Sequence, residues 1–302
     1  MRRYLYLIIM VLLLVGCGGG ERVRAVYHWK TTFNPTEYEL QWLRDHNVQR
    51  MYLRLFDVDV YDGEGGAAPI ATTRFLQPLP DSIEIVPVVY ITNEAMDQMW
   101  GGAERIVERV LKMADCNGFE VHELQVDCDW TGRTKNDYYW LCQRMQELLH
   151  ERDIELSSTV RLHQVDSTLS ELAVDRTVLM LYNTGDLRNA KTRNSILDYG
   201  DVEPYLGRLN SQTMDSMGVA WPVFGWGVAF DEEGRFSHIV GPAALAADSS
   251  AGLREEWGEM EQMRRVQRRL PRRRGSEVVL YHLDSLNLSK YTYDEIEELY
   301  NR

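Results

Sequence analysis

The sequence predicts an α/β protein that folds as a single (β/α)8 TIM barrel. Short apolar, β-prone segments alternate with helical patterns from residue 23 to the end of the 302-residue chain. Eight strand segments can be distinguished, and eight is the number of strands that closes this kind of parallel barrel. No glycine-rich phosphate loop follows the first strand, which disfavours the alternative of an open doubly wound sheet.

The first half of the chain supplies four of the strands. They are expected at residues 23–29, 51–60, 84–92 and 123–129. A helix is expected over residues 36–46, whereas residues 67–82 lack a periodic pattern and are expected to be irregular. Pro87 in the third strand has no amide hydrogen and predicts a bulge or an unpaired site there. Apolar residues spaced as on one helix face predict a helix that ends at Asn117-Gly118.

The second half supplies the other four strands and one insertion. The strands are expected at residues 155–163, 177–183, 219–230 and 277–283, and helices at residues 134–152, 202–209 and 293–300. The insertion, residues 231–275, contains a hairpin-like turn at 231–235 and a helical stretch at 253–270. Seven arginines fall between residues 264 and 274. We interpret them as a solvated face and loop, with contact to lipid headgroups or an acidic glycan as the alternative.

The N-terminus has the features of a secretory signal. Two arginines precede a short apolar run, and Leu14-Val15-Gly16-Cys17 resembles a bacterial lipobox, in which the cysteine is acylated, for example with palmitate. We therefore expect a signal peptide at residues 1–16, a lipidated Cys17 with a glycine-rich tether at 17–22, and the barrel at 23–302. The protein is then a lipoprotein anchored in the bacterial cell envelope, in the inner or the outer membrane. An ordinary signal peptide with a chance cysteine is the alternative.

Composition limits the partners. The formal net charge of −13 disfavours binding to nucleic acid or to anionic surfaces. Cys116, Cys128 and Cys142 are odd in number and follow no metal-ligand spacing, so they predict no disulfide framework. Cys128 and Cys142 are expected to be buried thiols. We expect a monomer with no cofactor, no metal and no nucleic-acid partner.

The fourth strand, residues 123–129, carries the most informative pattern. Leu124, Val126 and Cys128 alternate strictly with polar residues. Helices flank the strand, so the apolar side is expected to face them and the polar side to face the barrel interior. Site residues of a barrel lie at the C-terminal strand ends. Asp127 and Asp129 are therefore site candidates, and Glu123 is expected to be structural.

The two aspartates have the spacing of a paired acid and base. Residues on the same side of a strand lie about 6.6 Å apart, so Asp127 and Asp129 can share one site. The pKa values of two carboxylates at such a short distance move apart, so that one group is ionised and the other is more easily protonated. This arrangement suits acid/base chemistry at a glycosidic bond. No His-x-His pair occurs for a metal, and no Gly-x-Ser-x-Gly elbow occurs for a serine hydrolase.

These residues also carry a resemblance to family 18 glycoside hydrolases, the chitinase-like barrels. Asp127-Cys128-Asp129-Trp130 resembles the DxDW part of that family's DxxDxDxE signature, which lies on the fourth strand. Met180-Leu181-Tyr182-Asn183 resembles its Met-x-Tyr-Asp segment on the sixth strand. The resemblance covers most of the mature chain. It implies a barrel with a sugar-shaped cleft and roles for Asp127, Asp129 and Tyr182 in catalysis.

Three positions depart from the family pattern. The family's catalytic acid is a glutamate, and Thr131 stands at that place here. The strand-six aspartate is replaced by Asn183, and the first aspartate of the signature by Leu124. A threonine hydroxyl does not donate a proton as a carboxylic acid does, so the resemblance supports the fold and a sugar-binding cleft more than hydrolysis.

Further substrate-binding candidates follow from strand position. Gln125 lies on the polar side of the fourth strand, and Arg54 and Arg161 are expected either to reach the same interior or to form buried ion pairs with the acids. Aromatic residues near strand ends suit stacking on sugars. The remaining candidates are Trp130, Asn183, Trp226 and His28, with Trp221 as another strand-end aromatic.

Two classes of function remain open. In the first, the barrel hydrolyses a carbohydrate, with Asp129 or a loop carboxylate replacing the missing glutamate. The loop candidates are Glu94, Asp231 and Asp284. In the second, the barrel is a catalytically inactive glycan-binding or scaffold lipoprotein. The identity of the sugar does not follow from either.

Overall fold

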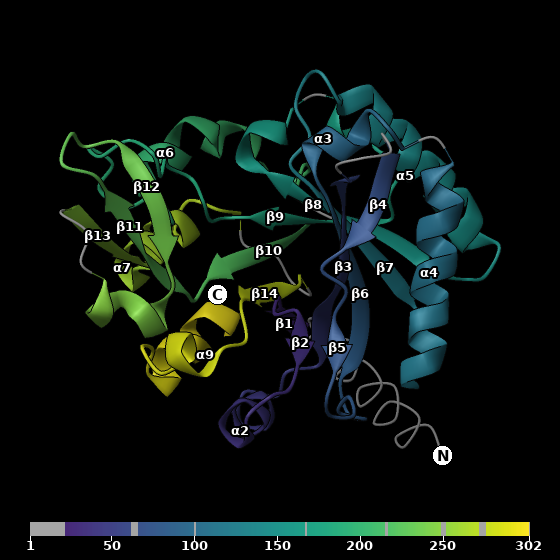
Figure 1. Cartoon of the computed structure of the whole chain (residues 1–302), viewed down its shortest axis with the longest axis horizontal. Coiled ribbons are helices and arrows are strands. Elements are labelled where there is room, and N and C mark those ends of the chain that lie inside the picture. Colours follow the sequence, from purple (N-terminus) through teal and green to yellow (C-terminus); the bar gives the residue numbers. More distant parts are fainter. Residues whose placement is uncertain are drawn as a thin grey trace, which may run out of the picture.

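The structure, a computed structural model, is a closed barrel of eight parallel strands (Figure 1). It describes residues 22–61, 66–99, 101–166, 168–214, 217–248, 252–271 and 276–301. The barrel strands are β1 (Arg24–His28), β3 (Arg50–Tyr61), β6 (Glu84–Ile91), β7 (Glu123–Cys128), β8 (Glu155–Arg161), β9 (Arg176–Met180), β10 (Met217–Pro222) and β14 (Val278–Tyr281). β1 pairs with both β3 and β14 and so closes the ring. The predicted fold class is confirmed. The predicted signal peptide and Cys17 lie outside the described residues.

Most of the predicted helices cover the outside of the barrel, but the helix predicted at 202–209 is mainly a 3-10 helix, η3 (Glu203–Arg208). The longer ones are α2 (Glu37–Asp45), α4 (Gly102–Asn117), α5 (Lys135–His150) and α9 (Tyr293–Asn301). α2 begins with a capping box, in which Thr36 Oγ1 accepts from the Glu39 amide and the Glu39 carboxylate accepts from the Thr36 amide. α4 ends at Gly118, whose φ of 70° is left-handed. Within the described residues, no helix has the length and apolarity needed to cross a membrane.

Short elements complete the connections. They are β2 (Thr32–Phe33), β4 (Gly66–Ile70), β5 (Arg74–Phe75), α3 (Asn93–Met96), η1 (Leu162–Gln164), η2 (Leu169–Glu171), α6 (Tyr199–Val202), η3 (Glu203–Arg208), η4 (Pro242–Ala247) and α8 (Ser285–Leu288). The expectation of an irregular segment at 67–82 is partly wrong, because β4 pairs antiparallel with the end of β3 and β5 pairs with β2. The register irregularity near Pro87 lies on β3, between Arg54 and Phe56.

The predicted seventh strand is two strands rather than one. β10 ends at Pro222, and β11 (Gly225–Phe230) forms the centre of a separate antiparallel sheet with β12 (Phe236–Val240) and β13 (Gly252–Trp257). The predicted helix at 253–270 is in fact β13 followed by α7 (Met260–Gln267). The apolar run 219–230 has no polar break, so its pattern did not mark the change of sheet. This insertion sheet groups with α6 and α7 beside the barrel (Figure 1).

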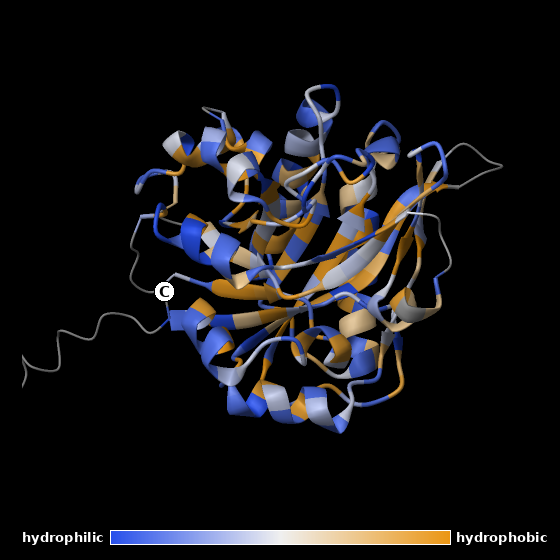
Figure 2. Ribbon diagram, turned by 90° about the vertical axis from the view of Figure 1, so that its left-hand side faces the viewer, coloured by the Kyte–Doolittle hydropathy of each residue, from blue (hydrophilic) through white to orange (hydrophobic). Residues whose placement is uncertain are grey.

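The side chains of β7 alternate as predicted. Cys128 is buried on the helix side, whereas Gln125 points into the barrel and accepts a hydrogen bond from Tyr27 Oη at 2.6 Å. Cys128 and Cys142 are buried free thiols, as expected. In Figure 2, hydrophobic residues concentrate on the strands, and hydrophilic residues lie on the outer faces of the helices.

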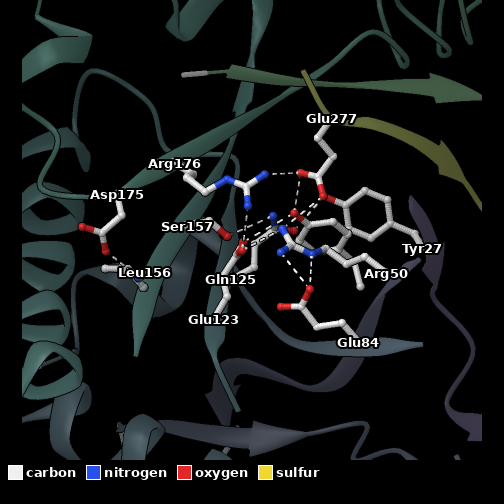
Figure 3. Close-up of polar contacts among 11 residues, drawn as sticks. Tyr27, Arg50, Glu84, Glu123, Gln125, Leu156, Ser157, Asp175, Arg176 and Glu277 are labelled. Carbon is white, nitrogen blue, oxygen red and sulfur yellow. Dashed lines mark hydrogen bonds and ion pairs between the residues drawn. The ribbon is translucent and has the colours of Figure 1, made fainter. Parts of the chain in front are cut away.

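A buried ion cluster fills the N-terminal end of the barrel (Figure 3). Arg50 donates to Glu123 at 3.0 Å and to Glu277 at 3.2 Å. Arg176 donates to the same two carboxylates, at 3.3 and 2.8 Å. Both glutamate side chains are only 2% exposed. Burial raises the pKa of Glu123, against the opposing effect of the two arginines. Glu123 is thus structural, as its N-terminal place on the strand predicts.

Candidate functional site

A cavity of about 430 Å³ opens at the C-terminal ends of β7, β8 and β9. Four of the predicted site residues line it: Asp129, Arg161, Tyr182 and Asn183. The rest of its wall consists of Leu162, His163, Met180, Thr184, Gly185, Leu187, Asp201 and Tyr205. Asp129 of the first family-like segment therefore meets Tyr182 and Asn183 of the second in one cavity, although the two segments are far apart in sequence.

Asp129 and Arg161 form a two-point ion pair across neighbouring strands. Asp129 follows β7 and Arg161 ends β8, which pairs with β7 in parallel. Arg161 Nε donates to Oδ1 at 2.6 Å and Nη2 donates to Oδ2 at 2.9 Å. Burial lowers the pKa of Arg161, but the hydrogen bond and the charge of Asp129 outweigh burial and raise it. Both carboxylate oxygens of Asp129 are therefore engaged by one cation.

Asp127 lies one pleat deeper and has a different environment. It is 7% exposed and accepts a hydrogen bond from Thr159 Oγ1 at 2.5 Å. Burial and the negative charge of Asp129 raise its pKa to about 6. The cavity wall includes Asp129 but not Asp127, so the expected sharing of one pocket by the two aspartates is not seen there.

Tyr182 belongs to an aromatic layer across the mouth of the barrel. Its ring stacks on Tyr281 with centroids 4.8 Å apart. Tyr281 also contacts Trp29, and Trp29 contacts Tyr90. Burial raises the pKa of Tyr281 and Tyr90. The sequence pattern did not mark Trp29, Tyr90 and Tyr281 as site residues, although Trp29 continues the inward alternation of Tyr27 on β1.

The far wall of the cavity comes from the segment after β9. Asn183 has a left-handed φ of 54°, which turns the chain away from the barrel. Asp201 and Tyr205 reach the cavity from α6 and η3. Burial and the nearby charge of Asp198 raise the pKa of Asp201. Residues 183–198 form no helix or strand in the described structure, so no periodic signal marked them.

Two predicted substrate-binding residues lie away from the cavity within the barrel. Gln125 is fully buried between Tyr27 and Ser157. Arg54 does not reach Asp127 or Asp129, because it is paired with Asp57 three residues along its own strand. These expectations placed the side chains correctly inside the barrel but chose the wrong partners for them.

The other three lie outside the barrel interior. His28 is buried against Phe33, because it faces the opposite side of β1 from Tyr27. Trp130 is 4% exposed and packs against Tyr138 and Tyr139 of α5. Trp226 lies on β11, in the insertion sheet. Their expected positions in the cleft are wrong.

The loop carboxylates also have other roles. Asp231 accepts from Arg235 within the hairpin of the insertion. Asp284 caps α8 and pairs with Lys30, and Glu94 is exposed on α3. None of the three lines the cavity. Among the described residues, no three His, Cys, Asp or Glu side chains are grouped so as to hold a metal ion.

Solved structures of chitinases share this fold. The chain is similar to the chitinase of Chromobacterium violaceum ATCC 12472, with a TM-score of 0.60 and 12% identity over 93% of this chain and 99% of that one. It is similar to the Bacillus cereus spore cortex-lytic enzyme SleL, with a TM-score of 0.56 and 13% identity over 92% and 74%. It is also similar to a mutant class V chitinase from Nicotiana tobaccum in complex with NAG4, with a TM-score of 0.59 and 10% identity over 93% of this chain and 99% of that one. No protein-family model matches the chain, and no curated protein matches its sequence.

Proposed function

We propose that this protein binds a carbohydrate chain in the cavity at the ends of β7, β8 and β9. The observation that carries the proposal is the meeting of Asp129, Tyr182 and Asn183 in one open cavity. This cavity offers a carboxylate and an amide that can bind sugar hydroxyls, beside an aromatic layer. Proteins hold sugars with such groups. The chitinase-like neighbours, one of them in complex with NAG4, favour an amino-sugar glycan.

Binding without hydrolysis fits the site better than hydrolysis does. Both oxygens of Asp129 are held by Arg161, so Asp129 is not free to transfer a proton. By its resemblance to the family signature, Thr131 occupies the place of the catalytic glutamate. Its backbone amide donates to Thr134 Oγ1 in the turn before α5. We infer a glycan-binding lipoprotein, held in the bacterial cell envelope by the lipid on Cys17.

The test is a calorimetric titration with NAG4. Asn183→Gly removes the side chain from the cavity and keeps the left-handed backbone, because glycine adopts positive φ freely. Asn47→Gly is the matched control, since Asn47 is also exposed and left-handed, with a φ of 49°, and it lies at the end of α2. We expect NAG4 to bind the wild type and the control equally, and to bind Asn183→Gly about tenfold more weakly. Equal affinity in all three proteins, or no binding to the wild type, would contradict the proposal.

One observation favours hydrolysis as a second candidate. Asp127 is buried beside Asp129, and its pKa of about 6 is that of a carboxylic acid able to donate a proton near neutral pH. If Asp127 is the acid, release of reducing ends from NAG4 falls as the pH rises above about 6 and is abolished in Asp127→Asn. The binding account predicts no release at any pH.

A further inference from the structure

The insertion sheet contains a fully buried carboxylate with a complete set of donors. The side chain of Glu256, on β13, is 0% exposed. Its Oε1 accepts from Arg254 Nε at 2.5 Å. Its Oε2 accepts from Ser195 Oγ at 2.5 Å and from Trp226 Nε1 at 2.8 Å. We call these four residues the Glu256 cluster. Trp226, expected from the sequence to be a sugar platform, instead donates a hydrogen bond inside the insertion.

The Glu256 cluster ties the insertion to the segment after β9. Besides its bond to Glu256, Arg254 donates through Nη1 to the carbonyl of Asn189 at 2.9 Å and through Nη2 to that of Leu187 at 3.1 Å. Asn194 Nδ2 donates to the carbonyl of Trp257 at 2.8 Å. One guanidinium therefore joins a buried carboxylate to two backbone carbonyls that belong to no helix or strand.

The same segment forms the cavity wall. Leu187, whose carbonyl accepts from Arg254, lines the cavity. Ser195, which donates to Glu256, accepts through its carbonyl from the amide of Gly185 at 3.1 Å. The amide of Thr184 donates to the carbonyl of Ile196 at 3.3 Å. Hydrogen bonds thus connect the segment that begins at Thr184 to the Glu256 cluster. The cavity lies on one side of this segment and the insertion sheet on the other.

We propose that Arg254 and Glu256 are positioning residues that fix the cavity wall formed by residues 183–187. Neither residue lines the cavity, so any effect on a ligand passes through the wall. Buried ion pairs add little net stability, but a fully satisfied polar network makes one arrangement of the chain unique. This inference rests on the proposed function only in its consequence for glycan binding; the effect on the wall is independent of it.

Arg254→Lys separates positioning from general stability. Lysine keeps the positive charge beside Glu256, but a single ammonium cannot span the carboxylate and both carbonyls. Arg235→Lys is the matched control, because Arg235 pairs with Asp231 and Glu233 in the exposed hairpin of the same insertion. Ser195→Ala is the second variant, since it removes one donor to Glu256 and no charge. If Arg254→Lys does not fold, Ser195→Ala carries the test.

The measurements are amide hydrogen exchange of the folded protein and titration with NAG4. We expect the amides of Thr184 and Gly185 to exchange about tenfold faster in Arg254→Lys and in Ser195→Ala, at a melting temperature close to that of wild type. The control is expected to match wild type. NAG4 affinity should fall together with the protection. Unchanged exchange at these amides in both variants would overturn the positioning role. Faster exchange with no NAG4 binding to wild type would leave that role standing and contradict the proposed function.

Discussion

Arg161 holds both carboxylate oxygens of Asp129, at 2.6 and 2.9 Å. Asp127, two residues earlier on the same side of the strand, has Thr159 as its hydrogen-bond donor instead. Two like residues at neighbouring positions therefore have opposite environments, one paired with a cation and one buried without such a partner. Substitution of Asp129 and substitution of Asp127 should therefore have different effects on stability.

Asp129→Asn should destabilise the fold. The substitution removes the partner of Arg161, whose side chain is 18% exposed, while Asp129 itself is 40% exposed. The cost should lie between those of exposed and buried ion pairs, roughly 1–3 kcal/mol. Denaturant unfolding measures it. Asp97→Asn, which removes an exposed pair with Arg133, is the control and should cost less than about 1 kcal/mol. Equal effects of the two substitutions would contradict the buried role of Arg161.

Asp127→Asn should leave stability unchanged at low pH and raise it at neutral pH. The pKa of Asp127 is raised from 3.8 to about 6, so the folded state binds its proton more tightly than the unfolded state does. Wild type should therefore lose stability as the pH rises from about 4 to about 6, by roughly 3 kcal/mol. The asparagine variant lacks this loss. Unfolding at a series of pH values measures the difference between the two proteins, and parallel curves would be inconsistent with the raised pKa.

Arg50→Met should be strongly destabilising. Arg50 is shared by Glu123 and Glu277, and its loss leaves these two buried carboxylates with one ion-pair partner, Arg176, and the hydroxyl of Tyr52 (Figure 3). Breaking such a cluster costs roughly 3–5 kcal/mol. Arg144→Met is the control, because Arg144 pairs only with exposed groups, and its unfolding midpoint should not change measurably. A small effect of Arg50→Met would mean that the cluster is not needed to hold the barrel.

Gly185→Ala should disturb the cavity wall. An added Cβ would lie 3.0 Å from Asp201 Oδ2 and 3.1 Å from the backbone Cα of Ser195. The backbone atom cannot rotate away, so we expect a loss of about 1–2 kcal/mol. At Gly207 an added Cβ meets no atom within 4 Å, and Gly207→Ala should be neutral or slightly stabilising. Denaturant unfolding of both variants tests the close contact at Gly185. Equal stabilities of Gly185→Ala and Gly207→Ala would refute it.

Cys17→Ser should release the protein from membranes. Without the thiol there is no acceptor for the acyl chain, and a protein without this lipid is no longer held at the membrane. Fractionation of cells followed by detection of the chain measures this. Retention of the variant in the membrane fraction would contradict the lipobox.

The sequence predicted the barrel and the interior face of β7 because a two-residue period leaves only one side for Gln125 and Asp127. The resemblance to the two family segments placed Asp129, Tyr182 and Asn183 in one site. The sequence did not predict that Arg54 pairs with Asp57, since which partner a long side chain reaches depends on packing across strands. Nor did it mark Asp201 and Tyr205, which lie beyond a segment without periodicity.

A crystal structure of the protein soaked with NAG4 tests the central claim most directly. The account predicts a sugar ring in the cavity at the ends of β7, β8 and β9, in contact with Asp129, Tyr182 and Asn183, with the glycosidic bonds intact. NAG4 bound elsewhere on the chain while this cavity stays empty would contradict it.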